Sequence, residues 1–128
     1  MLASKSVKFL IVDDSEAIRI AIKEILDATA YSCKYLEADN GYDAVKLFRD
    51  ESPDIVFLDI YMPRVDGIQS LKAMLTLNKK AKIIMITAAA NAKIVHEGIR
   101  LGARDYILKP FDRIALNNVM TKVMNQPW

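Results

Sequence analysis

Residues 9–15 read FLIVDDS, so four apolar residues run directly into two adjacent carboxylates, Asp13 and Asp14, and a serine. A short apolar run that ends in polar residues is typical of a buried strand. Two neighbouring acids at the end of such a strand repel each other, and partial burial disfavours their charged forms. We therefore expect a positive charge to lie close to these acids in the folded chain.

The pattern of this first segment recurs along the chain. Apolar runs of strand length predict strands at residues 7–12, 33–37, 54–58, 82–86 and 105–108. The segments between them have apolar residues three and four positions apart, which is the spacing of a helix with one buried face. The first helix is expected to begin near Ser15, and the next three to open at Gly41, Gly67 and Asn91. Five βα units joined by right-handed crossovers predict an α/β fold with a doubly wound, five-stranded parallel sheet.

Composition narrows the class of protein further. The chain has 128 residues, a size at which one domain over residues 1–128 is expected. A formal charge of +2 and the lack of a basic tract argue against direct nucleic-acid binding. No apolar run has the length of a membrane span or a signal peptide, which predicts a cytoplasmic protein without membrane insertion. Cys33 is the single cysteine, so no internal disulfide is possible.

Polar residues gather where the expected strands end. Ligands of open α/β sheets bind beyond the carboxyl ends of the strands. Those ends carry Asp13 and Asp14 after the first strand, Asp59 after the third, Thr87 after the fourth and Lys109 after the fifth. Each could be structural by itself, as a helix cap, a strand end or a solvated lysine. Together they favour a functional site, in which Lys109 supplies the expected positive charge and a divalent cation held by three carboxylates supplies more.

Four motifs carry a resemblance to a known family. They are LIVDDS at residues 10–15, FLDIYMPRVDG at 57–67, IMITA at 84–88 and YILKPF at 106–111. In this order and at these spacings the sequence resembles the receiver domain of two-component response regulators, most of all the single-domain chemotaxis-type regulators. The resemblance spans the whole chain. It implies a flavodoxin-like (βα)5 fold with strand order 2-1-3-4-5.

The resemblance also implies the roles of the strand-end residues. Asp59 would be the phosphoacceptor, which takes a phosphoryl group from a sensor histidine kinase or a histidine phosphotransferase. Mg²⁺ would be bound by Asp13, Asp14, Asp59 and the backbone carbonyl of Tyr61. Lys109 would stabilise charge on the opposite side of the transferred group. Such a protein acts on itself, by phosphoryl transfer and self-dephosphorylation, and is not an enzyme with external substrates.

The same resemblance implies a switch. The Thr87 hydroxyl would bond the phosphoryl group, and Tyr106 would then turn inward and reshape the surface of the fourth helix, fifth strand and fifth helix. A downstream protein partner would bind there. The resemblance further implies a cis Lys109-Pro110 peptide and a structural role for Gly67 at the start of the third helix.

Two positions that help set the lifetime of the phosphoryl group in this family are Tyr61 and Ala89. Neither side chain can place a water molecule as a carboxamide or carboxylate would, so slow self-dephosphorylation is expected. The cognate kinase, the output partner and the state of association on phosphorylation stay open. So does the question of whether the sequence is part of a longer protein.

Two other functional classes share parts of this pattern. Small aspartyl-phosphate phosphatases of the haloacid dehalogenase type also use an aspartate nucleophile, Mg²⁺ and a lysine on an α/β sheet. They need a second acid two residues after the nucleophile, where this chain has Tyr61, and a cap segment that it lacks. A flavin mononucleotide carrier needs a phosphate loop rich in Ser, Thr and Gly, whereas DDSE at residues 13–16 would repel a phosphate without a metal ion.

Overall fold

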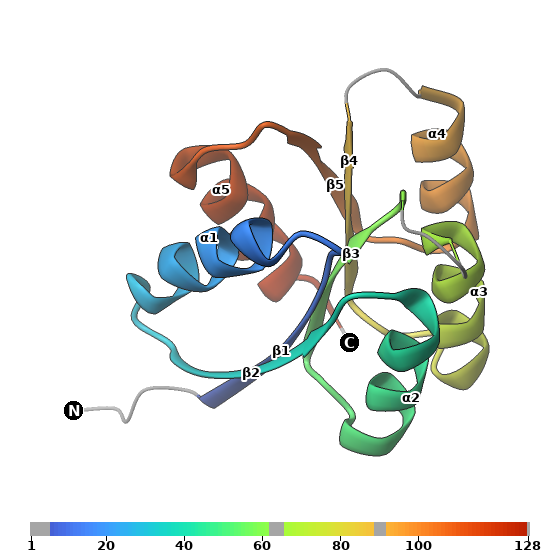
Figure 1. Ribbon diagram of the computed structural model, residues 1–128, viewed down its shortest axis with the longest axis horizontal. Coiled ribbons are helices and arrows are strands. Elements are labelled where there is room, and N and C mark those ends of the chain that lie inside the picture. The colour runs from blue at the N-terminus through green and yellow to red at the C-terminus, as the bar shows by residue number, and fades with distance from the viewer. Residues whose placement is uncertain (1–5, 62–65, 89–91, 128) are drawn as a thin grey trace.

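The computed structural model describes residues 6–61, 66–88 and 92–127. Within these ranges strands and helices alternate along the chain (Figure 1). The elements are β1 (Ser6–Val12), α1 (Glu16–Asp27), β2 (Ser32–Ala38), α2 (Gly41–Glu51), β3 (Ile55–Asp59), α3 (Gly67–Leu77), β4 (Ile83–Ala88), α4 (Ala92–Leu101), β5 (Asp105–Lys109) and α5 (Arg113–Met124). All neighbouring strands are parallel and their order is β2-β1-β3-β4-β5, which confirms the expected fold and topology.

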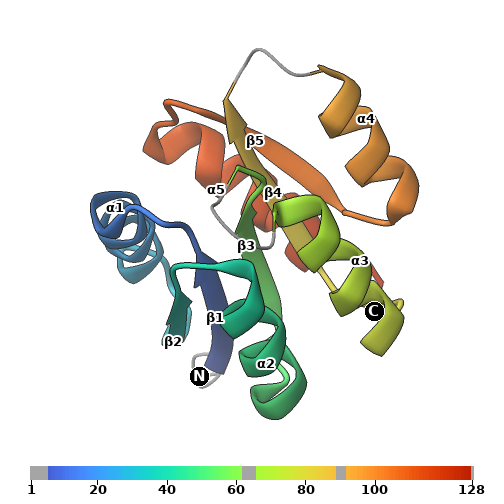
Figure 2. The ribbon, with the colours of Figure 1, turned by 45° about the vertical axis from the view of Figure 1, so that its right-hand side comes forward.

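Helices cover both faces of the sheet, with α1 and α5 on one side and α2, α3 and α4 on the other (Figures 1 and 2). Residues 9–12 of β1 are all apolar because successive side chains of the strand are buried on opposite faces of the sheet. Phe9 and Ile11 pack into the core beneath α1 and α5, whereas Leu10 and Val12 pack into the core beneath the other three helices. Burying each such side chain contributes about 1.5–3 kcal/mol, so both faces must be apolar for both helical layers to dock.

The helices begin at side chains that accept hydrogen bonds from the first turn. The Ser15 hydroxyl accepts from the amide of Ile18 before α1, and Asp66 accepts from the amide of Gln69 before α3. Helices α2 and α3 open at Gly41 and Gly67, as their sequences predicted. The expected opening residue of the fourth helix, Asn91, lies outside the described residues.

The strands that carry Asp59, Thr87 and Lys109 run one or two residues further than the sequence suggested. Asp59 and Lys109 are the last residues of β3 and β5, and Thr87 lies within β4, rather than after these strands. The ladder continues because backbone pairing does not depend on side-chain polarity: Asp59 lies opposite Ile86, and Thr87 lies opposite Leu108. The three polar side chains are therefore held by the sheet itself.

The C-terminal end of α5 is bound at the amino ends of the strands. Lys82 precedes β4 and is buried, and its Nζ donates to the carbonyl oxygens of Met124 at 3.2 Å and Gln126 at 2.7 Å. The residue was expected to open the fourth strand, which begins instead at Ile83. No helix within the described ranges is both long enough and apolar enough to span a lipid bilayer.

Candidate functional site

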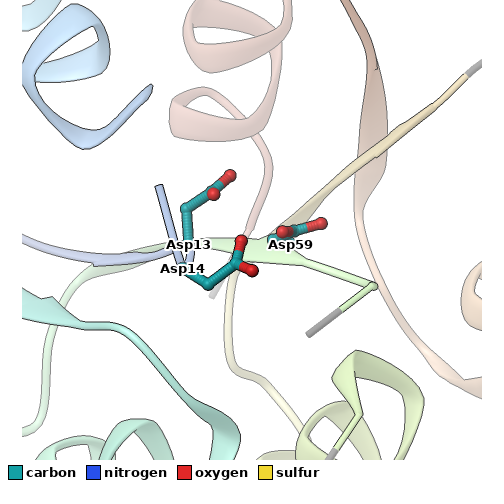
Figure 3. Close-up of side chains that lie close together, drawn as sticks. All are labelled: Asp13, Asp14 and Asp59. Carbon is teal, nitrogen blue, oxygen red and sulfur yellow. The ribbon is translucent and has the colours of Figure 1, made fainter. Parts of the chain in front are cut away.

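The carboxyl ends of β1 and β3 bring three aspartates together. Strands β1 and β3 are adjacent, and Val12 lies opposite Leu58. The next residues along the two strands, Asp13 and Asp59, must therefore also be neighbours. One carboxylate oxygen from each of Asp13, Asp14 and Asp59 lies within 4.8 Å of the others, and Figure 3 shows the three side chains close together at this edge. The sequence placed these residues at strand ends, and the register of the sheet makes them one cluster.

The three acids differ in exposure. Asp13 is 0% exposed and Asp59 is 3% exposed, whereas Asp14 is open to solvent. Backbone amides orient the two buried carboxylates: Asp13 Oδ1 accepts from the amide of Ser15 at 2.9 Å, and Asp59 Oδ1 accepts from the amide of Tyr61 at 3.1 Å. Each carboxylate has its second oxygen left for another partner.

Lys109 provides the positive charge at the cluster. Its Nζ lies 2.8 Å from Asp13 Oδ2 and 3.5 Å from Asp59 Oδ2. Burial by itself would lower the pKa of Lys109, but the hydrogen bond and charge of Asp13, together with Asp59, raise that pKa above its ordinary value. The lysine therefore stays protonated while it contacts both buried acids. The Lys109-Pro110 peptide that follows it is cis.

One lysine does not balance the negative charge. Burial, and then the charge of Asp13, raise the pKa of Asp59 from 3.8 to about 6, although Lys109 and the amide of Tyr61 act in the opposite direction. A hard divalent cation would remove this imbalance, because Mg²⁺ prefers several carboxylate and carbonyl oxygens. The residues present fit such an ion: three carboxylates gather within one ion's reach, and Asp14 leaves one side open to solvent.

Thr87 lies on β4, which neighbours β3, and Tyr106 lies on β5, the next strand in the sheet. Thr87 is fully buried, and its hydroxyl donates to the carbonyl of Ala88 at 3.3 Å. Tyr106 lies opposite Met85 in the β4–β5 ladder, and its side chain is 39% exposed. Tyr61 is 46% exposed beside Asp59, and Ala89 lies outside the described residues.

Two further residues at this edge were not singled out from the sequence. Arg19 of α1 donates from Nη1 to the main-chain oxygen of Asp13 at 2.7 Å and pairs through Nε with Glu37 of β2 at 3.0 Å. The spacing of Arg19 after the acid pair places it in the second turn of the first helix. Its partner on β2 depends on tertiary packing, which the local sequence does not specify.

Comparison with known proteins agrees with this geometry. Residues 9–121 match the response regulator receiver domain family. Protein CcdB of Bacillus subtilis is 41% identical over 117 residues, which cover 91% of this chain and 97% of that protein. Chemotaxis protein CheY of Bacillus subtilis is 38% identical over 118 residues, which cover 92% of this chain and 98% of that protein.

A solved structure, the CheX-CheY-BeF3-Mg+2 complex from Borrelia burgdorferi, has 32% identity and a TM-score of 0.86, covering 94% of this chain and 90% of that chain. The fold, the order of the strands and the extent of these matches agree with the resemblance carried by the four sequence motifs. The chain therefore belongs to the response regulator receiver domain family and is the receiver domain of a two-component response regulator.

Proposed function

We propose that residues 1–128 act as one cytoplasmic receiver domain that takes a phosphoryl group onto Asp59 from a sensor histidine kinase or a histidine phosphotransferase. One observation carries the proposal: Asp59 ends the central strand with its carboxylate next to two further acids and 3.5 Å from Lys109 Nζ. A carboxylate buried for structural reasons alone would need a positive partner but not two more acids beside it.

The transfer follows from this arrangement. A carboxylate oxygen of Asp59 attacks phosphorus, the bond from phosphorus to the donor nitrogen breaks, and the electron pair leaves with the imidazole, which takes up a proton. The product is an acyl phosphate on Asp59. Lys109 stabilises negative charge on the phosphoryl oxygens because its Nζ is already held between Asp13 and Asp59.

The residues that would hold Mg²⁺ are Asp13, Asp14, Asp59 and the backbone carbonyl of Tyr61. Bound there, the ion would neutralise charge that the acids and the incoming phosphoryl group share. Asp13 and Asp59 keep fixed orientations through the amides of Ser15 and Tyr61, so both carboxylates are preorganised for a cation.

A phosphatase of the haloacid dehalogenase type is not favoured, because Tyr61 occupies the position of the second acid that this class requires. The two functions differ in what happens to the phosphoryl group. With p-nitrophenyl phosphate and Mg²⁺, we expect no sustained release of nitrophenolate. Continuous turnover that the Asp59→Asn variant loses would contradict the proposal and support the phosphatase.

Phosphorylation is proposed to act on a downstream protein through the surface of α4, β5 and α5. The Thr87 hydroxyl bonds a neighbouring carbonyl in this structure and would have to turn to reach a phosphoryl oxygen. Tyr106 is 39% exposed in the same structure, so an inward turn of its ring would bury more of its surface. One contact with the phosphoryl group can shift the protein from one arrangement to the other only if their free energies differ by no more than a few kcal/mol.

Thr87→Ala should therefore separate phosphorylation from switching. We expect this variant to accept phosphate to a similar level, because Thr87 is not among the proposed ligands or the nucleophile. It should lose most of the phosphorylation-dependent changes in the amide NMR spectrum of α4, β5 and α5.

The matched control is Thr76→Ala on α3, where the hydroxyl is exposed and donates to the carbonyl of Lys72. This variant should show the wild-type changes. Wild-type changes at Tyr106 and α4 in Thr87→Ala would exclude the proposed route from Thr87 to Tyr106.

The proposed lifetime of the phosphoryl group is long. Tyr61 lies two residues after the phosphoacceptor, and its ring has no group that positions a water molecule for attack as a carboxylate would. Self-dephosphorylation should then be slow, because the attacking water molecule comes from solvent and is not positioned by a side chain.

A further inference from the structure

The main chain of Asp13 is fixed on both sides. Its amide donates to the carbonyl of Ala38 at the end of β2, at 3.1 Å. Its carbonyl oxygen accepts from Arg19 Nη1 at 2.7 Å. That carbonyl belongs to the peptide that joins Asp13 to Asp14, so its direction determines where the side chain of Asp14 can point.

Arg19 is itself held in place. Its Nε donates to Glu37 Oε1 at 3.0 Å, and its side chain is only 14% exposed. The other oxygen of Glu37 pairs with Lys23 Nζ at 2.8 Å. The guanidinium thus spans from β2 to the loop after β1, and it uses two N–H groups whose directions are fixed by one planar group.

We propose that Arg19, oriented by Glu37, is a positioning residue that holds the peptide between Asp13 and Asp14 in the arrangement that binds a divalent cation. This rests on the proposed Mg²⁺ site. The effect is one of geometry, since the positive charge of Arg19 would by itself oppose a cation and is balanced by the carboxylate of Glu37.

The Arg19→Lys variant distinguishes a role that depends on the geometry of the guanidinium from one that depends only on its charge. A lysine has one compact ammonium group and cannot keep the fixed directions with which a guanidinium bonds both the Asp13 carbonyl and Glu37. If Arg19 acts by position, Arg19→Lys should bind Mg²⁺ as weakly as Arg19→Ala. If only a positive charge were needed, Arg19→Lys should behave like the wild type.

The test is a Mg²⁺ titration of the unphosphorylated protein, followed by the amide NMR shifts of Asp14 and Tyr61. Loss of residues that orient metal ligands commonly weakens metal binding by about 10–100-fold, and we expect about tenfold for Arg19→Ala and for Arg19→Lys. Glu37→Gln should weaken binding by a smaller factor, because the guanidinium keeps its bond to Asp13.

The matched control is Lys23→Gln, which removes the other cation from Glu37 but touches neither aspartate. Its affinity should stay within about twofold of the wild type, since exposed ion pairs contribute little. Urea unfolding of each variant separates a loss of affinity from a loss of stability. If Lys23→Gln loses as much affinity as Arg19→Ala, the effect belongs to the ion-pair network and the proposal is wrong.

Two results distinguish this inference from the proposed function. A wild-type protein that shows no Mg²⁺-dependent shifts would overturn the metal site and this inference with it. A wild-type protein that binds Mg²⁺, together with an Arg19→Lys variant of equal affinity, would overturn the role of Arg19 alone.

Discussion

Asp59→Asn should make the metal-free protein more stable at neutral pH, by about 3 kcal/mol in the free energy of unfolding. Burial and the charge of Asp13 raise the pKa of Asp59 to about 6 in the folded protein, from 3.8. At neutral pH the carboxylate is charged in both states, but only the folded state holds it in a buried site next to another acid. Asparagine keeps the shape of the side chain and carries no charge.

The sign of the pH dependence follows from the same shift. Because the pKa is raised on folding, the folded state binds the proton more tightly than the unfolded state. The contribution of Asp59 to stability is therefore complete below about pH 4 and is lost as the pH rises through about 6. Asp59→Asn should remove this part of the dependence, as measured by urea unfolding in EDTA at about pH 5 and about pH 7.

Glu24→Gln on the exposed face of α1 is the control, and it should keep the wild-type dependence on pH. Adding Mg²⁺ should stabilise the wild type more than Asp59→Asn, because a ligand stabilises the state that binds it. A less stable Asp59→Asn protein with an unchanged pH dependence would mean that the charge of Asp59 does not destabilise the folded protein.

Gly67→Ala should destabilise the protein by about 3 kcal/mol and disturb the phosphoacceptor. A Cβ atom at Gly67 would lie 2.5 Å from the carbonyl oxygen of Asp59 and also overlap the Cα atom of Ile60. Both are main-chain atoms, which cannot rotate away. The amide of Gly67 also donates to the carbonyl of Ile60 at 2.9 Å, so α3 cannot move outward without breaking this bond.

Gly98→Ala on α4 is the matched control. There the added Cβ would overlap the thioether of Met85, which is a flexible side chain and not backbone. Alanine also gains about 1 kcal/mol of helix propensity over glycine, which offsets part of the clash. Urea midpoints should therefore fall much further for Gly67→Ala, and equal losses for the two variants would refute the close-packing argument.

The fold could be predicted from the sequence because apolar runs of strand length alternate with segments of helical spacing, and most of these runs lead directly into a polar residue. Parallel strands have their carboxyl ends at one edge of the sheet, so the positions of Asp13, Asp59 and Lys109 at strand ends predicted a single cluster of polar side chains. The extent of the strands was less predictable. Asp59, Thr87 and Lys109 belong to their strands because backbone pairing continues past the last apolar residue.

The tertiary partners of Lys82 and Arg19 could not be predicted. Lys82 looked like the polar start of a strand, since lysines are rarely buried, yet it is 1% exposed and bonds carbonyls at the end of α5. Nothing in the local sequence singles out Arg19, because its partners lie on β2 and in the loop after β1. Both roles depend on tertiary packing and leave no periodic signal.

The most direct test of the central claim is the intact mass of the protein after incubation with acetyl phosphate. In the presence of Mg²⁺ the wild type should gain one phosphoryl group, whereas the wild type in EDTA and the Asp59→Asn variant with Mg²⁺ should gain none. An equal gain by Asp59→Asn, or by the wild type in EDTA, would contradict the account.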